Sequence, residues 1–206
     1  FSAMFGVFGL AEAVNLLMQY ERTPGTYGHD AVANDLAYLV TRSVAQRVAN
    51  RPIVHCAGNG GHCFLHAQSG IDSDVGVTAG VRIPIGDEPP LAAHLATVAP
   101  HHHLFQAGVS DILHFDDTAR RNPAAVVDIL RGGFRNGMRD MTFNLDSNDF
   151  IRITGYLVRK SDLERIGDGA RHGSTFLGAG SEHEAHRSQR AAKRVMCGER
   201  APRAAG

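Results

Sequence analysis

The sequence predicts an α/β fold for this chain of 206 residues. Short runs rich in Val, Ile and Phe alternate with longer segments whose apolar residues recur at helical spacing. Clusters of glycine and proline separate these segments, as expected of turns and loops. The chain is long enough to bury one hydrophobic core, and no internal repeat divides it.

In the first half of the chain, two helices precede two short strands. Residues 3–20 carry apolar residues at helical spacing and predict a buried helix. Residues 29–49 predict an amphipathic helix. Its expected apolar face consists of Val32, Leu36, Leu39, Val40, Val44 and Val48. We expect short strands at 52–56 and 63–67, on either side of a glycine-rich loop at 58–61.

The second half alternates strands and helices and then ends in a polar tail. Residues 74–86 include Pro84 and predict irregular backbone or an edge strand. Asn122-Pro123 predicts the start of a helix, because proline is favoured in the first turn, and Gly132-Gly133 predicts its end. The other expected elements are a helix at 89–97, strands at 110–115 and 141–145, and a short helix from Ser161. A polar tail follows at 183–206, and we expect its last dozen residues to be disordered.

Composition narrows the classes of partner. The formal net charge is zero, so the chain gives no reason to expect binding to nucleic acid or to an acidic membrane surface. No apolar run reaches membrane-spanning length. Three cysteines, an odd number, do not suggest a disulfide framework, and we expect a reducing, cytoplasmic location. Because the chain begins at Phe1, directly in an apolar segment, we expect it to be the C-terminal part of a longer enzyme.

One glycine lies in an apolar stretch, the segment 150–158, and the chemistry considered for it here is implied by the family resemblance given in the next paragraph. A radical on a backbone α-carbon is stabilised when that carbon is planar and conjugated with both flanking amides. A side chain opposes this planarity, and Gly155 has none. Arg152 and Tyr156 carry strong hydrogen-bond donors that can fix such a loop. The simpler interpretation is a strand with a glycine at a bend or bulge.

The string Arg-Ile-Thr-Gly-Tyr at 152–156 resembles the radical-bearing loop of glycyl radical enzymes. Thr154 departs from that pattern only slightly, since the position is more often Ser, Cys or Ala. Three further segments are similar to the YjjI-like branch of these enzymes, and together they extend the resemblance over about residues 1–182. These segments are 1–15, 141–149 and 172–180.

The resemblance implies the C-terminal portion of a ten-stranded α/β barrel, with the glycine loop inserted at its centre. Residues 1–117 would form part of a half-barrel, and residues 118–182 would form the glycine radical domain. The implied cofactor is a protein-derived glycyl radical at Gly155, supported by Arg152, Thr154 and Tyr156. Such a radical passes to a cysteine, whose thiyl radical abstracts hydrogen from a small-molecule substrate.

The resemblance also implies partners. A separate radical S-adenosylmethionine activating enzyme carries the S-adenosylmethionine and the iron–sulfur cluster, so this chain needs no bound cofactor of its own. The thiyl cysteine is expected on sequence N-terminal to Phe1. Dimers are common in the family, which makes a homodimer one assembly that the resemblance allows.

Four polar residues are candidates for contact with a substrate or for positioning the glycine loop. Asn144, Asp146 and Asn148 precede the loop directly, and Arg82 lies in an otherwise apolar stretch from which it can reach an anionic substrate. Turns capped by Asn and Asp side chains explain the first group equally well, and a structural ion pair explains Arg82.

Two His-Cys dipeptides form the next cluster, His55-Cys56 and His62-Cys63. Imidazole and thiolate are zinc-ligand types, but this spacing matches no common finger or ribbon. One of these cysteines could instead be the thiyl cysteine. The favoured interpretation is that both are buried and act as small hydrophobic residues. The histidine run 101–103 is expected to lie in a solvated loop.

Three other functions compete with this one. An anaerobic ribonucleotide reductase typically carries paired zinc-binding cysteines before its glycine loop, whereas residues 120–154 contain none. A stand-alone, non-catalytic subunit that replaces a damaged glycine loop would need no thiyl cysteine, but the resemblance of residues 1–15 to a full-length enzyme argues against it. The third is an α/β domain without radical chemistry.

Overall fold

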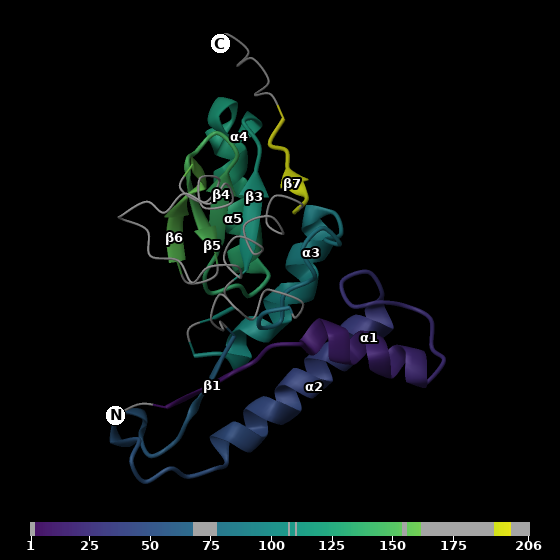
Figure 1. Ribbon diagram of the computed structural model, residues 1–206, viewed down its shortest axis with the longest axis vertical. Helices are drawn as coiled ribbons and strands as arrows, with labels where there is room; N and C mark the ends of the chain where they lie inside the picture. The colour runs from purple at the N-terminus through teal and green to yellow at the C-terminus, as the bar shows by residue number, and fades with distance from the viewer. Residues whose placement is uncertain are drawn as a thin grey trace.

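The computed structural model describes residues 3–67, 78–106, 108–109, 111–153, 156–161 and 192–198. These residues form helices, two small parallel sheets and one antiparallel strand pair, in agreement with the predicted α/β class. Figure 1 shows two long helices and a strand pair at one end of the molecule, and a sheet with its covering helices at the other. None of the described helices combines the length and the hydrophobicity needed to cross a lipid bilayer.

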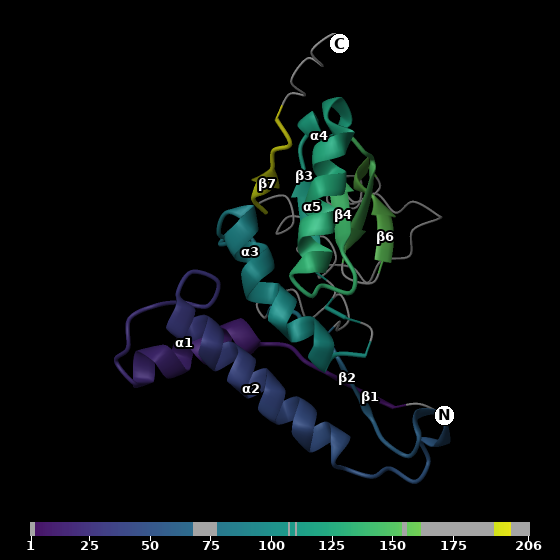
Figure 2. The same cartoon turned by 180° about the vertical axis from the view of Figure 1, so that it is seen from behind.

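The N-terminal end consists of a helix pair and a two-stranded parallel sheet. Helices α1 (Leu10–Tyr20) and α2 (Ala31–Ala49) lie side by side (Figures 1 and 2). Strand β1 (Met4–Gly6) pairs with β2 (Phe64–His66), so the predicted helix at 3–20 begins later than expected. Gly9, with φ of 77°, separates β1 from α1, because this left-handed conformation belongs to neither a strand nor a helix.

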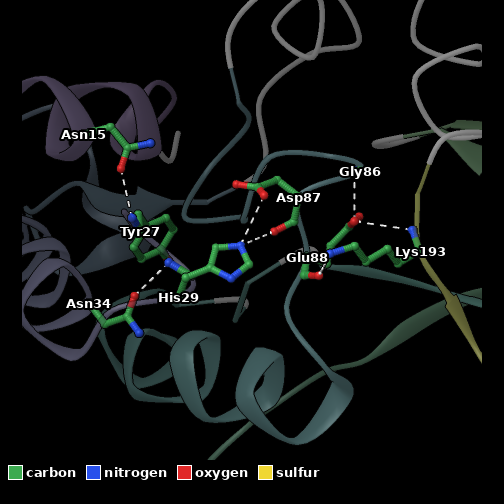
Figure 3. Close-up of polar contacts among 9 residues, drawn as sticks. Asn15, Tyr27, His29, Asn34, Gly86, Asp87, Glu88 and Lys193 are labelled. Carbon is green, nitrogen blue, oxygen red and sulfur yellow. Dashed lines mark hydrogen bonds and ion pairs between the residues drawn. The ribbon is translucent and has the colours of Figure 1, made fainter. Parts of the chain in front are cut away.

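Asparagine side chains fix the connection between α1 and α2. Asn15 Oδ1 accepts the Tyr27 N–H at 2.8 Å, and Asn34 Oδ1 accepts the Gly28 N–H at 2.8 Å (Figure 3). Asp30 caps α2 by accepting the Val32 N–H. These bonds place the fully buried Tyr27 ring in the core.

The apolar face of α2 differs from the prediction. Its buried positions are Ala33, Ala37 and Thr41, which are small enough to let neighbouring backbone approach closely. Val32, Leu39 and Val44 of the expected face are exposed instead. Leu36, Val40 and Val48 do pack against the core from its margin. Helical spacing therefore predicted the helix but not the direction in which it faces.

The other end is built on a parallel sheet of order β4-β3-β7, made of β3 (Ile112–Phe115), β4 (Thr142–Leu145) and β7 (Arg194–Val195). Figure 2 shows α4 (Thr118–Arg121) and α5 (Pro123–Arg135) against one face of this sheet. The antiparallel strands β5 (Phe150–Ile153) and β6 (Tyr156–Arg159) lie beyond β4, on the side away from β7 (Figures 1 and 2). Helix α3 (Leu91–Val98) and η3 (Ala99–Leu104) lie between the two ends of the molecule (Figures 1 and 2), whereas η1 (Ala57–Asn59) belongs to the loop that joins α2 to β2.

Alternation along the strands gives the sheet one apolar face and one polar face. Leu113, Phe115, Leu145 and Val195 belong to a hydrophobic cluster that also includes Val126 and Ile129 of α5. Side chains at the intervening positions point to the other face, because successive residues of a strand alternate. That second face carries the polar residues described below.

The prediction that Gly132 and Gly133 end helix α5 is wrong. Helix α5 continues through Gly132-Gly133 to Arg135, so these residues do not end it. A Cβ on Gly133 would lie 2.5 Å from the Met141 sulfur, which means that this glycine permits close packing of the helix on the sheet. The helix ends at Arg135 with Asn136 as its C-cap, and Gly137 follows with the positive φ of 102° that is common just after a helix.

Two further predictions are wrong in part. Residues 52–56 do not form a strand: Pro52 makes a single bridge to His62, and Val54 is 88% exposed in a turn. Residues 192–198 were placed in the polar tail, yet β7 pairs with β3, and Cys197 hydrogen-bonds to Thr118 and Asn122. Strands of two residues leave no periodic signal in a sequence.

The remaining expected elements are present. The helix at 89–97, the strands at 63–67, 110–115 and 141–145, and the irregular backbone at 78–86 correspond to described elements. Residues 74–77 and the short helix beyond Ser161 lie outside the described residues.

Candidate functional site

The segment singled out by its glycine forms two paired strands. In β5 and β6, Ile153 lies opposite Tyr156 and Arg152 lies opposite Leu157. Thr154 and Gly155, which join these strand ends in the sequence, lie outside the described residues, as do the side chains of 151–158. Paired strands on both sides of Gly155 agree with a radical loop and also with the simpler strand and bend.

Polar bonds close the other end of this strand pair. Asp149 accepts the Ser161 N–H at 3.1 Å and the Ser161 hydroxyl at 2.8 Å, while its backbone oxygen accepts the Lys160 N–H. The Ser161 bonds lower the pKa of the Asp149 carboxyl, so it stays charged at neutral pH. Lys160 Nζ also donates to the Asp146 backbone oxygen at 2.7 Å. The strands that flank Gly155 are therefore tied back to the end of β4.

A row of polar residues crosses the neighbouring sheet on the face away from α5. His114 of β3 is in register with Asn144 of β4 on one side and with Arg194 of β7 on the other. Residues in register on adjacent strands share a face. His114 and Asn144 are buried, and Arg194 Nε donates to both carboxylate oxygens of Asp146, at 2.7 and 2.9 Å.

Three of the four polar residues predicted from the sequence lie in this region. Asn144 and Asp146 belong to the row, and the buried Arg82 lines a small hollow together with His114. Asn148 does not join them: it is exposed, and its Oδ1 accepts the Phe150 N–H at 3.3 Å. This bond is the one that an Asx turn makes, as the turn interpretation describes.

A buried histidine–carboxylate pair adjoins this row and was not predicted. His94 Nε2 of α3 lies 2.6 Å from Asp111 Oδ2, just before β3, and both side chains are 7% exposed. Asp111 Oδ1 accepts the Ile112 N–H at 3.0 Å. The sequence did contain a signal, because His94 lies in an apolar helix and Asp111 opens an apolar strand. Polar side chains that are buried at such positions need hydrogen-bond partners.

The two members of this pair stabilise each other's charges. Burial lowers the pKa of His94, but the charge and hydrogen bond of Asp111 outweigh it and raise that pKa above 6.5. Burial raises the pKa of Asp111, yet the charge and hydrogen bond of His94, with the Arg82 charge, lower it from 3.8 to about 2. The pair is therefore an imidazolium and a carboxylate at moderately acidic pH.

The pKa of His114 is shifted in the opposite direction to that of His94. Burial and the Arg194 charge lower the pKa of His114 from 6.5 to about 4, although Asp146 opposes them. The ring is neutral at pH 7 and can both donate and accept a hydrogen bond. The region thus offers one charged imidazole, one neutral imidazole and guanidinium groups, a set suited to binding and orienting a small polar molecule.

The His-Cys dipeptides do not form a metal site in the described part of the chain. Cys56 and Cys63 are buried, while His55 and His62 are exposed. Burial, together with neighbouring Cys56, raises the pKa of the Cys63 thiol. Among the described residues no group of three or more His, Cys, Asp or Glu could hold a metal ion. The favoured interpretation, two buried cysteines, is confirmed.

The histidine run was predicted wrongly as a solvated loop. His101 and His102 are fully buried in η3, and only His103 is exposed. The His101 ring packs edge-on against Tyr27 and Tyr38, and burial lowers its pKa to about 4. His102 Nδ1 accepts the N–H groups of Val109 and Arg139. The tight 3₁₀ turn directs two adjacent rings inward.

Comparison with known proteins identifies relatives over most of the chain. The family model described as "Glycyl radical enzyme YjjI-like" matches residues 1–193. "Uncharacterized protein YjjI" of Escherichia coli (strain K12) is 49% identical over 179 residues, which cover 86% of this chain and 34% of that protein. An "Uncharacterized protein" of Haemophilus influenzae (strain Rd) is 36% identical over 187 residues, 88% of this chain and 36% of that protein. No solved structure matches. The chain thus spans about a third of the length of these curated relatives.

Proposed function

The chain belongs to the YjjI-like family of glycyl radical enzymes, and on this premise we propose that it stores a backbone radical at Gly155 for anaerobic radical catalysis. The observation that carries the proposal is the Arg-Ile-Thr-Gly-Tyr string inside a match that covers residues 1–193. The resemblance to this family that the sequence indicated is thereby confirmed.

The arrangement around Gly155 supports this role. The strands on either side of it are paired, and Asp149 and Ser161 hold their far ends together. A radical on an α-carbon is quenched by solvent and oxygen, so it needs a fixed, enclosed backbone. Arg152 and Tyr156 flank the glycine and are proposed to hold the loop through their hydrogen-bond donors.

The rest of the catalytic assembly is proposed to come from other parts of the protein and from a partner. A separate radical S-adenosylmethionine enzyme would remove one hydrogen atom from the Gly155 α-carbon. A cysteine on the part of the longer protein that this chain does not cover would relay the radical to a small-molecule substrate. In that setting the helices and strands described here would belong to a ten-stranded α/β barrel, which encloses the glycine loop.

Electron paramagnetic resonance tests the proposal directly. The full-length protein is co-expressed anaerobically with its activating enzyme, beside Gly155→Ala and Gly132→Ala. A Cβ at Gly132 meets no atom within 4 Å, so that variant controls for the substitution itself. We expect a carbon-radical doublet in the parent and in Gly132→Ala, and none in Gly155→Ala.

Exposure to air gives a second readout. Oxygen reacts with a backbone radical and cleaves the chain, so activated protein should yield a fragment that ends at Gly155, and unactivated protein should not. A competent activating enzyme that produces neither a doublet nor a cleaved chain would contradict the proposal. The glycine would then be only a bend between β5 and β6.

A further inference from the structure

A cavity of about 350 Å³ lies between the start of α3, strand β3 and strand β7, and the radical loop does not account for it. Its volume falls in the range of small-molecule sites, about 300 to 1,000 Å³. One wall is apolar and includes Pro90, Leu91 and Val195. The polar lining residues are Glu88, His94, His114, Lys193 and Arg194. A lining that combines apolar and polar side chains suits a small molecule with an apolar body and a polar group.

His94 presents a hydrogen-bonding group at this cavity. Its Nε2 is held by Asp111 at 2.6 Å, and no described residue bonds to its other ring nitrogen, Nδ1. Asp111 fixes the ring in place and favours its charged form, in which Nδ1 carries a proton. The His94 side chain is 7% exposed and lines the cavity, so a ligand bound there can accept a hydrogen bond from this nitrogen.

The rim of the cavity is held in place from both sides. Lys193 donates its backbone N–H to the Glu88 carboxylate and its Nζ to the Glu88 backbone oxygen, and Gly86 donates to the same carboxylate (Figure 3). His29 anchors the neighbouring Asp87 from the α1–α2 side of the molecule (Figure 3). The cavity mouth is therefore a defined part of the fold.

Cationic groups border the cavity among the described residues. His94, Lys193 and Arg194 line it, and the charge and hydrogen bond of Asp111 raise the pKa of His94. The lining also includes Glu88, whose carboxylate accepts the Lys193 N–H, and His114, which is neutral. The protonated imidazole of His94 favours a ligand with a negative charge.

We propose that this cavity binds a small organic carboxylate with a short apolar body, whose carboxylate accepts a hydrogen bond from His94 Nδ1. The apolar body would lie against Pro90, Leu91 and Val195. That this carboxylate is the substrate of the enzyme rests on the proposed function. Binding itself requires no radical and is measured on the unactivated protein.

Calorimetric titration of the full-length, unactivated protein tests this at pH 6.0, with butanoate and with the neutral, similarly shaped butanamide. We expect saturable binding of butanoate and at least about tenfold weaker binding of butanamide, because a hydrogen bond to a charged group contributes about 1.5 to 3 kcal/mol. Inorganic phosphate, an anion without an apolar body, should bind more weakly than butanoate.

Three variants locate the site. His94→Gln should weaken butanoate binding about tenfold, whereas His62→Gln, an exposed histidine outside the cavity, should not change it. Lys193→Gln, at the exposed rim, should weaken it about threefold and keeps the test valid if His94→Gln does not fold. Equal binding of butanoate and butanamide, tighter binding of phosphate, no saturable binding, or unchanged affinity in both cavity variants would overturn the proposal.

The two proposals fail separately. A missing radical doublet alongside His94-dependent butanoate binding would overturn the radical function and leave the carboxylate site. A radical doublet without His94-dependent butanoate binding would support the radical function and overturn the carboxylate site.

Discussion

Replacing Asp111 by Asn tests whether the buried pair with His94 contributes to stability through its charges. Asn has nearly the same shape and retains an oxygen that can accept a hydrogen bond, so packing is little changed. What the substitution removes is the negative charge that lies 2.6 Å from the imidazole. Because both side chains are almost fully buried, solvent does not screen this interaction as it would at the surface.

The magnitude follows from the shifted titration of Asp111. Its pKa falls from 3.8 to about 2 on folding, and a tenfold change in proton affinity corresponds to about 1.4 kcal/mol. The charged carboxylate therefore contributes about 2 kcal/mol above pH 4. This contribution is lost as the pH falls from about 4 to 2. In that range the unfolded state binds a proton at Asp111 more readily than the folded state does, so a lower pH favours unfolding.

His94 sets the upper limit of the same pH window. Its pKa is raised in the folded state, so its contribution is complete below 6.5 and declines as the pH rises through the folded pKa. The stability difference between the parent and Asp111→Asn should therefore be largest between about pH 4 and 6.5. Urea unfolding followed by circular dichroism at pH 2.5, 5.5 and 8.5 measures it. A difference that is the same at all three pH values, or below about 0.5 kcal/mol at pH 5.5, would refute the reasoning.

Two further substitutions test contacts that hold the fold together. In urea unfolding, Gly80→Ala should destabilise the protein by at least about 2 kcal/mol more than Gly60→Ala does. Both glycines have a positive φ, so the backbone strain of an alanine is similar at the two positions. Only at Gly80 would the new Cβ overlap another atom, the Ala67 carbonyl oxygen at 1.9 Å. Equal losses would contradict this steric explanation. Thr118→Val removes the hydroxyl that accepts the Cys197 N–H at 2.7 Å, so hydrogen exchange at that amide should accelerate about tenfold or more; unchanged exchange would mean that pairing with β3 alone holds β7.

The sequence predicted the elements better than the way in which they pack. Proline at the start of α5 and the apolar runs of β3 and β4 are local signals, and each corresponds to an observed element. At Gly133 the space for a side chain is taken by Met141, which lies in a different segment, so no local rule could reveal this close approach. The short strand β7 exists only because β3 offers it an edge, and two residues carry no period.

The site shows the same division. The sequence singled out Gly155 because the chemistry proposed for it involves the immediate neighbours Arg152 and Tyr156. His94 and Asp111 lie seventeen positions apart, with η3 between them, so the pair forms only when the chain is folded. The histidine run at 101–103 was misjudged for a related reason, since polar composition favours a surface loop unless the fold supplies aromatic partners such as Tyr27.

Asp146, just after β4, connects the row of polar residues across the sheet with the strand pair of β5 and β6. It binds Arg194 of this row through its carboxylate, and accepts Lys160 at the base of β5 and β6 through its backbone oxygen. Burial of a charged pair such as His94–Asp111 is unfavourable unless the surroundings compensate it, so a fold that needed only stability would gain from apolar residues there. Buried charges that line a cavity and are tied through Asp146 to β5 and β6 are better explained by the binding of a charged ligand, as proposed above, than by stability.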